Sequence, residues 1–234
     1  HTDAVQATGH LPIDFTRDGF DLLTLSAHKF HGPRGMGALV CSHRVVPASL
    51  VHGGAQERGH RAGTSNVAGA AGMAAALDEA CDRLEANTSQ VEALRERLVR
   101  GLASTEGVRM LGPTEPSLRL PGIVALTLDG VDHQRSLVLL DELGICLSAG
   151  SACAAGALEE SHVLSAMGIS PEVGHTYLRV SLDAEENDEA DVDRAVEAIA
   201  KVAARLRKRG EGHPAQPHVS ANPPSGTPAG GDAR

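Results

Sequence analysis

The sequence predicts an α/β fold, and three stretches of the chain indicate it. Residues 20–42 contain two apolar, strand-like runs joined by a turn rich in glycine and proline. Residues 65–104 carry alanines and leucines at helical spacing, which predicts long helices. Residues 105–209 mix short apolar runs with amphipathic segments, as is typical of a smaller α/β domain. We therefore expect a first region with long helices over 1–104 and a second, smaller α/β domain over 105–209.

Local signals place the individual elements. Strands are expected at 1–6, 108–111, 122–128, 145–147 and 177–182, besides the two runs already named. Helices are expected at 67–81, from Thr88 or Ser89 onward, at 132–143, at 159–167 and after Asn187. Thr64 is the expected N-cap of the first helix and Asn187 that of the last. Residues 211–234 hold no leucine, isoleucine or aromatic side chain, so they should form a disordered tail.

The composition limits the class of protein. Of 234 residues, 41% are hydrophobic but only 2% are aromatic, so a sizeable core must be built from aliphatic side chains. The formal net charge of −9 argues against nonspecific binding to nucleic acid. No apolar run is long enough to span a membrane, and the four cysteines form no C-x-x-C pair. These features favour a protein of the reducing cytoplasm.

Lys29 is the candidate residue around which the chain is organised. It ends the stretch Ser26-Ala-His-Lys29, where the first strand of the 20–42 pair runs out. The glycines that follow leave free space, and Asp3 lies at the end of an earlier strand-like run. A lysine amine attacks carbonyls when it is desolvated or close to other cations. Pyridoxal phosphate requires such a lysine, together with an acid that keeps its ring nitrogen protonated.

Five motifs give the chain its resemblance to a known family. They are His1-Thr-Asp-Ala-Val-Gln-Ala7, Ser26-Ala-His-Lys29 followed by Gly32-Pro33, Arg58-Gly-His-Arg-Ala-Gly-Thr64, Ser148-Ala-Gly-Ser-Ala-Cys153 and Leu178-Arg-Val-Ser-Leu182. In this order they resemble the cysteine desulfurases, pyridoxal-phosphate enzymes of fold type I in the class V aminotransferase group. The resemblance covers residues 1–209 and only the C-terminal part of a family member. It implies the last part of a cofactor-binding large domain with a mixed, mostly parallel sheet, followed by a small C-terminal α/β domain.

The resemblance implies a role for each motif residue at the cofactor. Lys29 would hold pyridoxal phosphate as a Schiff base, with His28 as a second catalytic residue. Asp3 would contact the pyridine nitrogen and Gln6 the phenolic oxygen, while Ser26 and His28 supply part of the phosphate contacts. Thr64 would reach the cofactor phosphate of the other subunit, which implies a homodimer.

Cys153 is the candidate for the sulfur chemistry. It lies between Leu147 and Leu158 in a loop without large side chains, which we expect to be mobile. Cys146 and Cys41 instead fit the ordinary role of a small buried hydrophobe. The resemblance implies that the Cys153 thiolate attacks the sulfur of cofactor-bound L-cysteine, leaving a persulfide and L-alanine. The length of the loop resembles desulfurases that serve iron–sulfur cluster assembly and transfer-RNA thiolation, so a sulfur-acceptor or scaffold protein is the implied partner.

Arg179 is the candidate substrate-binding residue. In the run 177–182, Leu178, Val180 and Leu182 alternate with Arg179, which predicts that Arg179 lies on the polar face of a strand. The resemblance implies a bidentate clamp on the substrate carboxylate, a geometry that suits guanidinium.

Other interpretations remain open. The chain fits another class V enzyme, such as an aminotransferase or selenocysteine lyase, or a truncated non-catalytic module that binds a sulfur carrier. His28-x-x-His31 also suggests a metal site, although no second pair completes a zinc pattern. The chain begins at His1, so we expect a fragment. The family's phosphate loop and ring-stacking histidine would lie upstream, and the fragment alone is expected to be inactive.

Overall fold

The computed structural model describes residues 1–149 and 161–208. These residues form two compact units that interleave along the chain. Unit 1 comprises His1–Arg100, Gly112–Val124 and Ser181–Arg194, and unit 2 comprises Gly101–Leu111, Ala125–Val180 and the residues from Ala195 onward. The fold is mixed α/β, as the sequence predicts, whereas a separate C-terminal domain that begins at residue 105 stays a prediction.

Unit 1 contains a three-stranded sheet in the order β1-β2-β3. β1 (Thr2–Asp3) runs parallel to β2 (Leu22–Ser26), and β3 (Gly37–Cys41) pairs antiparallel to β2. The strand pair expected within residues 20–42 is therefore confirmed. The strand expected over 1–6 is wrong beyond Asp3, because the Ala7 and Thr8 amides donate to the Ala4 carbonyl and turn the chain.

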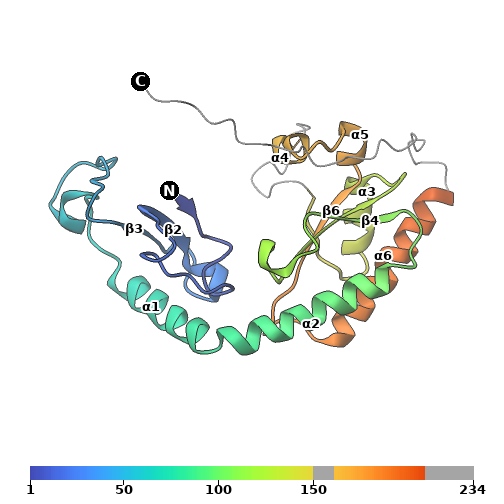
Figure 1. The fold of residues 1–234 in the computed structure, drawn as a ribbon, viewed down its shortest axis with the longest axis horizontal. Coiled ribbons are helices and arrows are strands. Elements are labelled where there is room, and N and C mark those ends of the chain that lie inside the picture. The colour runs from blue at the N-terminus through green and yellow to red at the C-terminus, as the bar shows by residue number, and fades with distance from the viewer. Residues whose placement is uncertain (150–160, 209–234) are drawn as a thin grey trace, which may run out of the picture. The chain divides into compact units, whose positions relative to one another are not determined.

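Two long helices follow, α1 (Val67–Asp82) and α2 (Leu84–Leu102) (Figure 1). The expected N-cap of α1 is wrong, because the side chain of Asn66, not that of Thr64, accepts a hydrogen bond from the Gly69 amide. The second helix begins four to five residues before the expected start at Thr88 or Ser89, because α1 ends and α2 begins across Arg83 alone.

Glycines let α1 pack closely against the segment that follows Lys29. A methyl group added to Gly72 would come within 2.8 Å of Pro33 Cγ, and one added to Gly69 within 2.7 Å of Met36 Sδ. Neither neighbour has room for that methyl group without moving. The small residues of α1 therefore bring its backbone against the turn between β2 and β3.

The second sheet has the order β4-β5-β6, formed by β4 (Val108–Leu111), β5 (Ile123–Leu128) and β6 (Tyr177–Ser181). β4 and β5 pair antiparallel. Leu126, Leu128 and Leu178 are fully buried, as expected for the apolar faces of these strands. The remaining helices are α3 (His133–Asp141), α4 (His162–Ala166), α5 (Pro171–Gly174) and α6 (Glu189–Lys208), besides short 3-10 helices at Ala27–Phe30 (η1), Gln56–Gly59 (η2) and Pro116–Leu118 (η3).

Two further expectations are wrong. No strand forms at 145–147; there the Ile145 amide donates to the Leu140 carbonyl and continues the end of α3. Asn187 does not cap α6, because its side chain accepts from the Asp183 amide. Asp188 takes that role, since its Oδ1 accepts from the Asp191 amide at 2.8 Å.

Among the helices of the described ranges, none is long and apolar enough to cross a membrane. The tail expected over 211–234 lies outside the described residues.

Candidate active site

Lys29 lies in a short, firmly anchored turn. β2 ends and η1 follows directly, with Ala27 and Phe30 0% and 2% exposed. These two side chains hold the turn because they are buried in the core of unit 1. The amides of His31 and Gly32 both donate to the Ala27 carbonyl and close the turn. Lys29 therefore projects from a backbone with a defined conformation.

Lys29 differs from the other lysines of the chain. The sequence contains three, Lys29, Lys201 and Lys208. Lys201 and Lys208 are exposed on α6, whereas Lys29 is half-buried. Among the described residues, the Lys29 ammonium makes no hydrogen bond or ion pair. Its amine is thus available to a carbonyl ligand.

The two polar residues before Lys29 bind each other. Ser26 Oγ and His28 Nδ1 lie 2.8 Å apart. Ser26 stands at the N-cap position of η1, but its hydroxyl makes no capping bond and is used to orient the His28 ring. His28 is exposed, and Nδ1 is the ring nitrogen that this contact uses. Their contacts to a cofactor phosphate stay a prediction.

Asp3 lies at the same edge of the sheet as the Lys29 turn. β1 and β2 are parallel, with Asp3 opposite Thr24, so their carboxyl ends meet at one edge, where ligands bind in open α/β sheets. Thr24 is two residues before the end of β2, or about 7 Å along the strand. The exposed Asp3 carboxylate accepts from the Val5 amide at 3.0 Å. Gln6 is exposed just beyond the end of β1, the position it needs if both side chains contact one ligand.

Thr64 ends a glycine-rich loop with unusual backbone. Glu57 and Arg58 in this loop have φ of 49° and 56°, values that are uncommon for residues other than glycine. Thr64 is exposed, and within the described part of the chain it makes no hydrogen bond with the Lys29 turn. One copy of the chain thus does not join Thr64 to Lys29, and its reach to another subunit stays a prediction.

Arg179 lies on β6 in unit 2, on the face opposite the buried Leu178 and Val180. The expected alternation of this strand is confirmed. Arg179 Nε is buried without a hydrogen-bond partner among the described residues. Burial raises the pKa of the neighbouring Tyr177 hydroxyl, and the positive charge of Arg179 opposes that rise. An unpaired guanidinium nitrogen of this kind suits an anionic ligand group, because a buried donor without a partner is costly.

The burial of the cysteines differs from the expectation. Cys153 lies outside the described residues. Cys146 and Cys41 are both exposed, so the expectation that they are small buried hydrophobes is wrong. Cys146 lies after the end of α3 rather than in a buried strand, with its Sγ 3.9 Å from Asp141 Oδ1. Exposure alone therefore does not single out Cys153.

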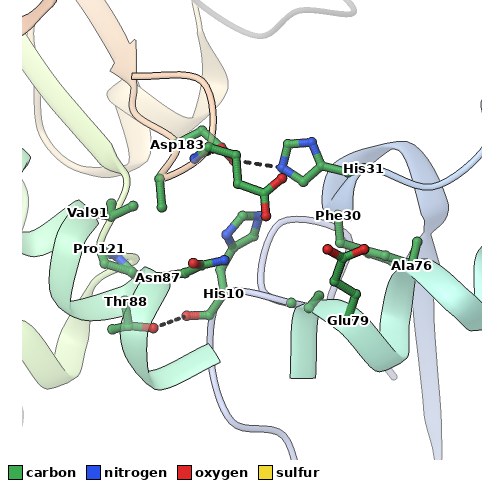
Figure 2. A pocket seen from close by; sticks show the side chains of 14 residues that line it. His10, Phe30, His31, Ala76, Glu79, Asn87, Thr88, Val91, Pro121 and Asp183 are labelled. Carbon is green, nitrogen blue, oxygen red and sulfur yellow. Dashed lines mark hydrogen bonds and ion pairs between the residues drawn. The ribbon is translucent and has the colours of Figure 1, made fainter. Parts of the chain in front are cut away.

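A pocket in unit 1 is lined by Phe30 and His31 but not by Lys29 (Figure 2). Its wall also includes His10 and Thr88, with the Thr88 hydroxyl 3.4 Å from the His10 carbonyl. Neither Asp3 nor the other expected cofactor contacts line it. Sequence reasoning missed His10, because its contacts are to Lys29 and Thr88, which are far away in the chain.

His28 and His31 do not act as a pair. His28 contacts Ser26, whereas His31 Nε2 lies 3.1 Å from Asp183 Oδ2 (Figure 2). In the described ranges, no three histidine, cysteine, aspartate or glutamate side chains gather as a metal site would require. The geometry of unit 1 therefore favours a lysine-centred site over a metal centre.

A half-buried lysine at the carboxyl edge of a partly parallel sheet, with an aspartate on the neighbouring strand, suits pyridoxal phosphate, which needs a lysine for its Schiff base and an acidic partner for its ring nitrogen. The model of the aminotransferase class-V family matches residues 1–195. The chain belongs to the aminotransferase class-V family.

Relatives that the chain matches are named as cysteine desulfurases. The chain is 43% identical to "Cysteine desulfurase IscS" of Clostridium botulinum and 44% identical to "IscS-like cysteine desulfurase" of Mycobacterium tuberculosis, each over 209 residues and 89% of the chain. It covers 52% and 53% of those two proteins. The solved NifS-like protein from Rickettsia africae matches with a TM-score of 0.78 and 31% identity, over 86% of the chain and 52% of that structure. The chain thus spans about half the length of the curated relatives it matches.

Proposed function

We propose that this chain is part of a pyridoxal-phosphate-dependent cysteine desulfurase that converts L-cysteine to L-alanine. The sulfur would pass as an enzyme persulfide to an acceptor or scaffold protein, for iron–sulfur cluster assembly or thiolation in the cytoplasm. The observation that carries the proposal is the half-buried, unpaired Lys29 at the sheet edge that also holds Asp3. The similarity to named cysteine desulfurases supports this choice among class V reactions.

The residues present fit pyridoxal phosphate. Lys29 would hold it covalently, Asp3 and Gln6 would contact its ring, and Ser26 and His28 would bind part of its phosphate. When bound, this group supplies an electron sink for bond cleavage at the substrate α-carbon. Thr64 would complete the phosphate contacts from the second subunit of a homodimer, which agrees with its exposure here.

Four side chains of the chain would carry out proton transfer, substrate binding and sulfur transfer. Lys29 would move the proton at the substrate carbon once its amine is released, and His28, oriented by Ser26, would exchange a proton at Nε2. Arg179 would bind the substrate carboxylate through the guanidinium that includes its unpaired Nε. The Cys153 thiolate would attack the substrate sulfur, so that an S–S bond forms as the substrate's Cβ–S bond breaks; the electron pair of the broken bond stays on the carbon fragment, which takes up a proton on its way to L-alanine, and the sulfur remains on Cys153 as a persulfide.

Peptide mapping after borohydride reduction tests the cofactor site. The protein that contains this chain is incubated with pyridoxal phosphate, reduced and digested. With three lysines in the chain, the pyridoxyl group is expected on Lys29, while Lys201→Ala should leave the labelling unchanged. Labelling of Lys201 or Lys208 in place of Lys29 would contradict the proposal.

Product analysis tests the reaction. L-alanine and sulfide formed from L-cysteine under a reductant would support a desulfurase. Keto-acid formation with an amino acceptor would instead indicate an aminotransferase, and turnover confined to selenocysteine a selenocysteine lyase. Binding of a sulfur carrier without cofactor would indicate the non-catalytic module. We also propose that the 234-residue chain by itself has no useful turnover.

A further inference from the structure

We infer that His10 is a positioning residue for Lys29, an inference that rests on the proposed function. His10 Nε2 lies 2.9 Å from the Lys29 carbonyl oxygen, although the two residues are 19 apart in sequence. A carbonyl oxygen only accepts, so Nε2 must carry the hydrogen. His10 therefore holds the main chain of the reactive lysine from the side of the pocket, without touching the amine.

His10 can do this because it ends a rigid turn. The Thr8 amide and the buried Thr8 hydroxyl both donate to the Ala4 carbonyl, and the His10 amide donates to the Ala7 carbonyl. The His10 carbonyl faces the Thr88 hydroxyl of α2, as Figure 2 shows. The main chain of His10 is thus fixed on both sides.

Gly9 brings this turn against the Lys29 turn. Its φ is +81°, and an added methyl group would come within 2.8 Å of Phe30 Cβ. Only glycine combines that backbone with that distance at low cost. The contact between Gly9 and Phe30 sets how closely the two turns approach. The hydrogen bond from His10 to the Lys29 carbonyl sets how they are aligned with each other.

This arrangement links the two proposed cofactor contacts. Asp3 immediately precedes the turn that ends at His10, and Asp3 is also paired with β2 through Thr24. The contact between His10 and Lys29 closes residues 10–29 into a loop, and the pairing of Asp3 with Thr24 closes residues 3–24. His10 should therefore fix the distance between the acid and the lysine amine.

Substitution of His10 tests the inference. His10→Leu removes the donor, whereas His10→Gln places an N–H group at a similar reach. Since a hydrogen bond contributes about 0.5–1.5 kcal/mol, His10→Leu should slow attachment of pyridoxal phosphate to Lys29 about 2- to 10-fold. Any background attachment of pyridoxal phosphate to the exposed Lys201 should keep the same rate. His10→Gln should restore most of the rate of attachment to Lys29. His43→Leu, at an exposed histidine, is the matched control.

Two readouts do not depend on the cofactor. Hydrogen exchange of the His31 and Gly32 amides, which close the Lys29 turn, should quicken in His10→Leu by about the same factor. Nitrogen NMR of the unsubstituted protein should show a hydrogen on His10 Nε2. A ring with its hydrogen on Nδ1 alone would overturn the inference even if His10→Leu failed to fold.

The outcomes separate this inference from the proposed function. If the unsubstituted protein labels Lys29 and His10→Leu labels it equally fast with unchanged amide exchange, His10 has no positioning role. If the unsubstituted protein does not label Lys29 at all, the proposed function fails. The amide exchange and the ring hydrogen then still decide whether His10 holds the turn.

Discussion

Arg179 and Ser148 exchange two main-chain hydrogen bonds, at 2.7 and 3.1 Å, in an isolated antiparallel bridge. Arg179 is the proposed carboxylate-binding residue, and Ser148 lies five residues before Cys153 in the sequence. The bridge therefore ties the start of the cysteine-bearing segment to the strand position of the proposed substrate contact. Two of the predictions below concern Arg179 and Cys153.

Substitution Arg179→Lys should weaken binding of L-cysteine. Lysine keeps the charge but loses the planar fork that binds a carboxylate with two bonds. Loss of one charge-assisted bond, about 1.5–3 kcal/mol, should raise KM about 10- to 100-fold with little change in the labelling of Lys29. Steady-state kinetics of the protein that contains the chain measure this.

The control for Arg179 is Arg100→Lys on the surface of α2, where the arginine pairs with Glu96. An equal rise of KM in both variants would show that Arg179 does not contact the substrate.

Substitution Cys153→Ser should stop sulfide release and leave the cofactor in place. A serine hydroxyl is not a thiolate at neutral pH and cannot carry sulfur as a persulfide. Borohydride labelling of Lys29 should be unchanged, while sulfide from L-cysteine falls to background. Cys146→Ser is the matched control because Cys146 is also exposed. Full activity in Cys153→Ser together with loss in Cys146→Ser would move the sulfur-carrying role to Cys146.

Substitution Gly72→Leu should destabilise unit 1. A side chain here meets Pro33 Cγ at 2.8 Å from its Cβ, and overpacking of this kind costs about 1–3 kcal/mol. Thermal or urea unfolding should show the loss. The neighbouring Ala71 is exposed, so Ala71→Leu should leave the free energy of unfolding within about 0.5 kcal/mol. Similar midpoints for the two variants would argue against the close contact.

The ion pair of Arg97 and Asp193 should make stability depend on pH on the acid side. Arg97 Nε lies 2.7 Å from Asp193 Oδ1, and its hydrogen bond lowers the pKa of the Asp193 carboxyl. A carboxyl whose folded pKa is below the unfolded value, about 3.9, stabilises the fold above that value and loses this effect as pH falls through the folded pKa.

The measurement is urea unfolding of Asp193→Asn beside the unsubstituted chain. The variant should be less stable at about pH 6, and the difference should vanish towards about pH 2. The effect should be small because the pair is exposed. Glu197→Gln, at an exposed position of the same helix, should show no such dependence. A difference between Asp193→Asn and the unsubstituted chain that persists at low pH would point to another cause.

The sequence predicted those parts of the fold that depend on local pattern. Two apolar runs joined by a glycine-rich turn predict the strand pair β2–β3 around Lys29, and this prediction is confirmed. The alternation of apolar and polar residues along β6 predicts that Arg179 lies on the polar face, which is also confirmed. The two helix caps were predicted wrongly, because Asn66 replaces Thr64, which has a lower capping propensity, and Asp188 replaces Asn187, which has a similar one. His10 was missed because a bond across 19 residues leaves no periodic signal in the sequence.

The two glycines of α1 constrain the length of that helix. Gly69 and Gly72 are three residues apart and share one face, which meets Met36 and Pro33. One residue inserted between them would rotate the second by about 100° and turn a side chain toward the loop after Lys29. Insertions and deletions are thus better tolerated before Gly69 or after Gly72 than between them. The close packing of α1 against the segment after Lys29 therefore fixes the number of residues between these two glycines.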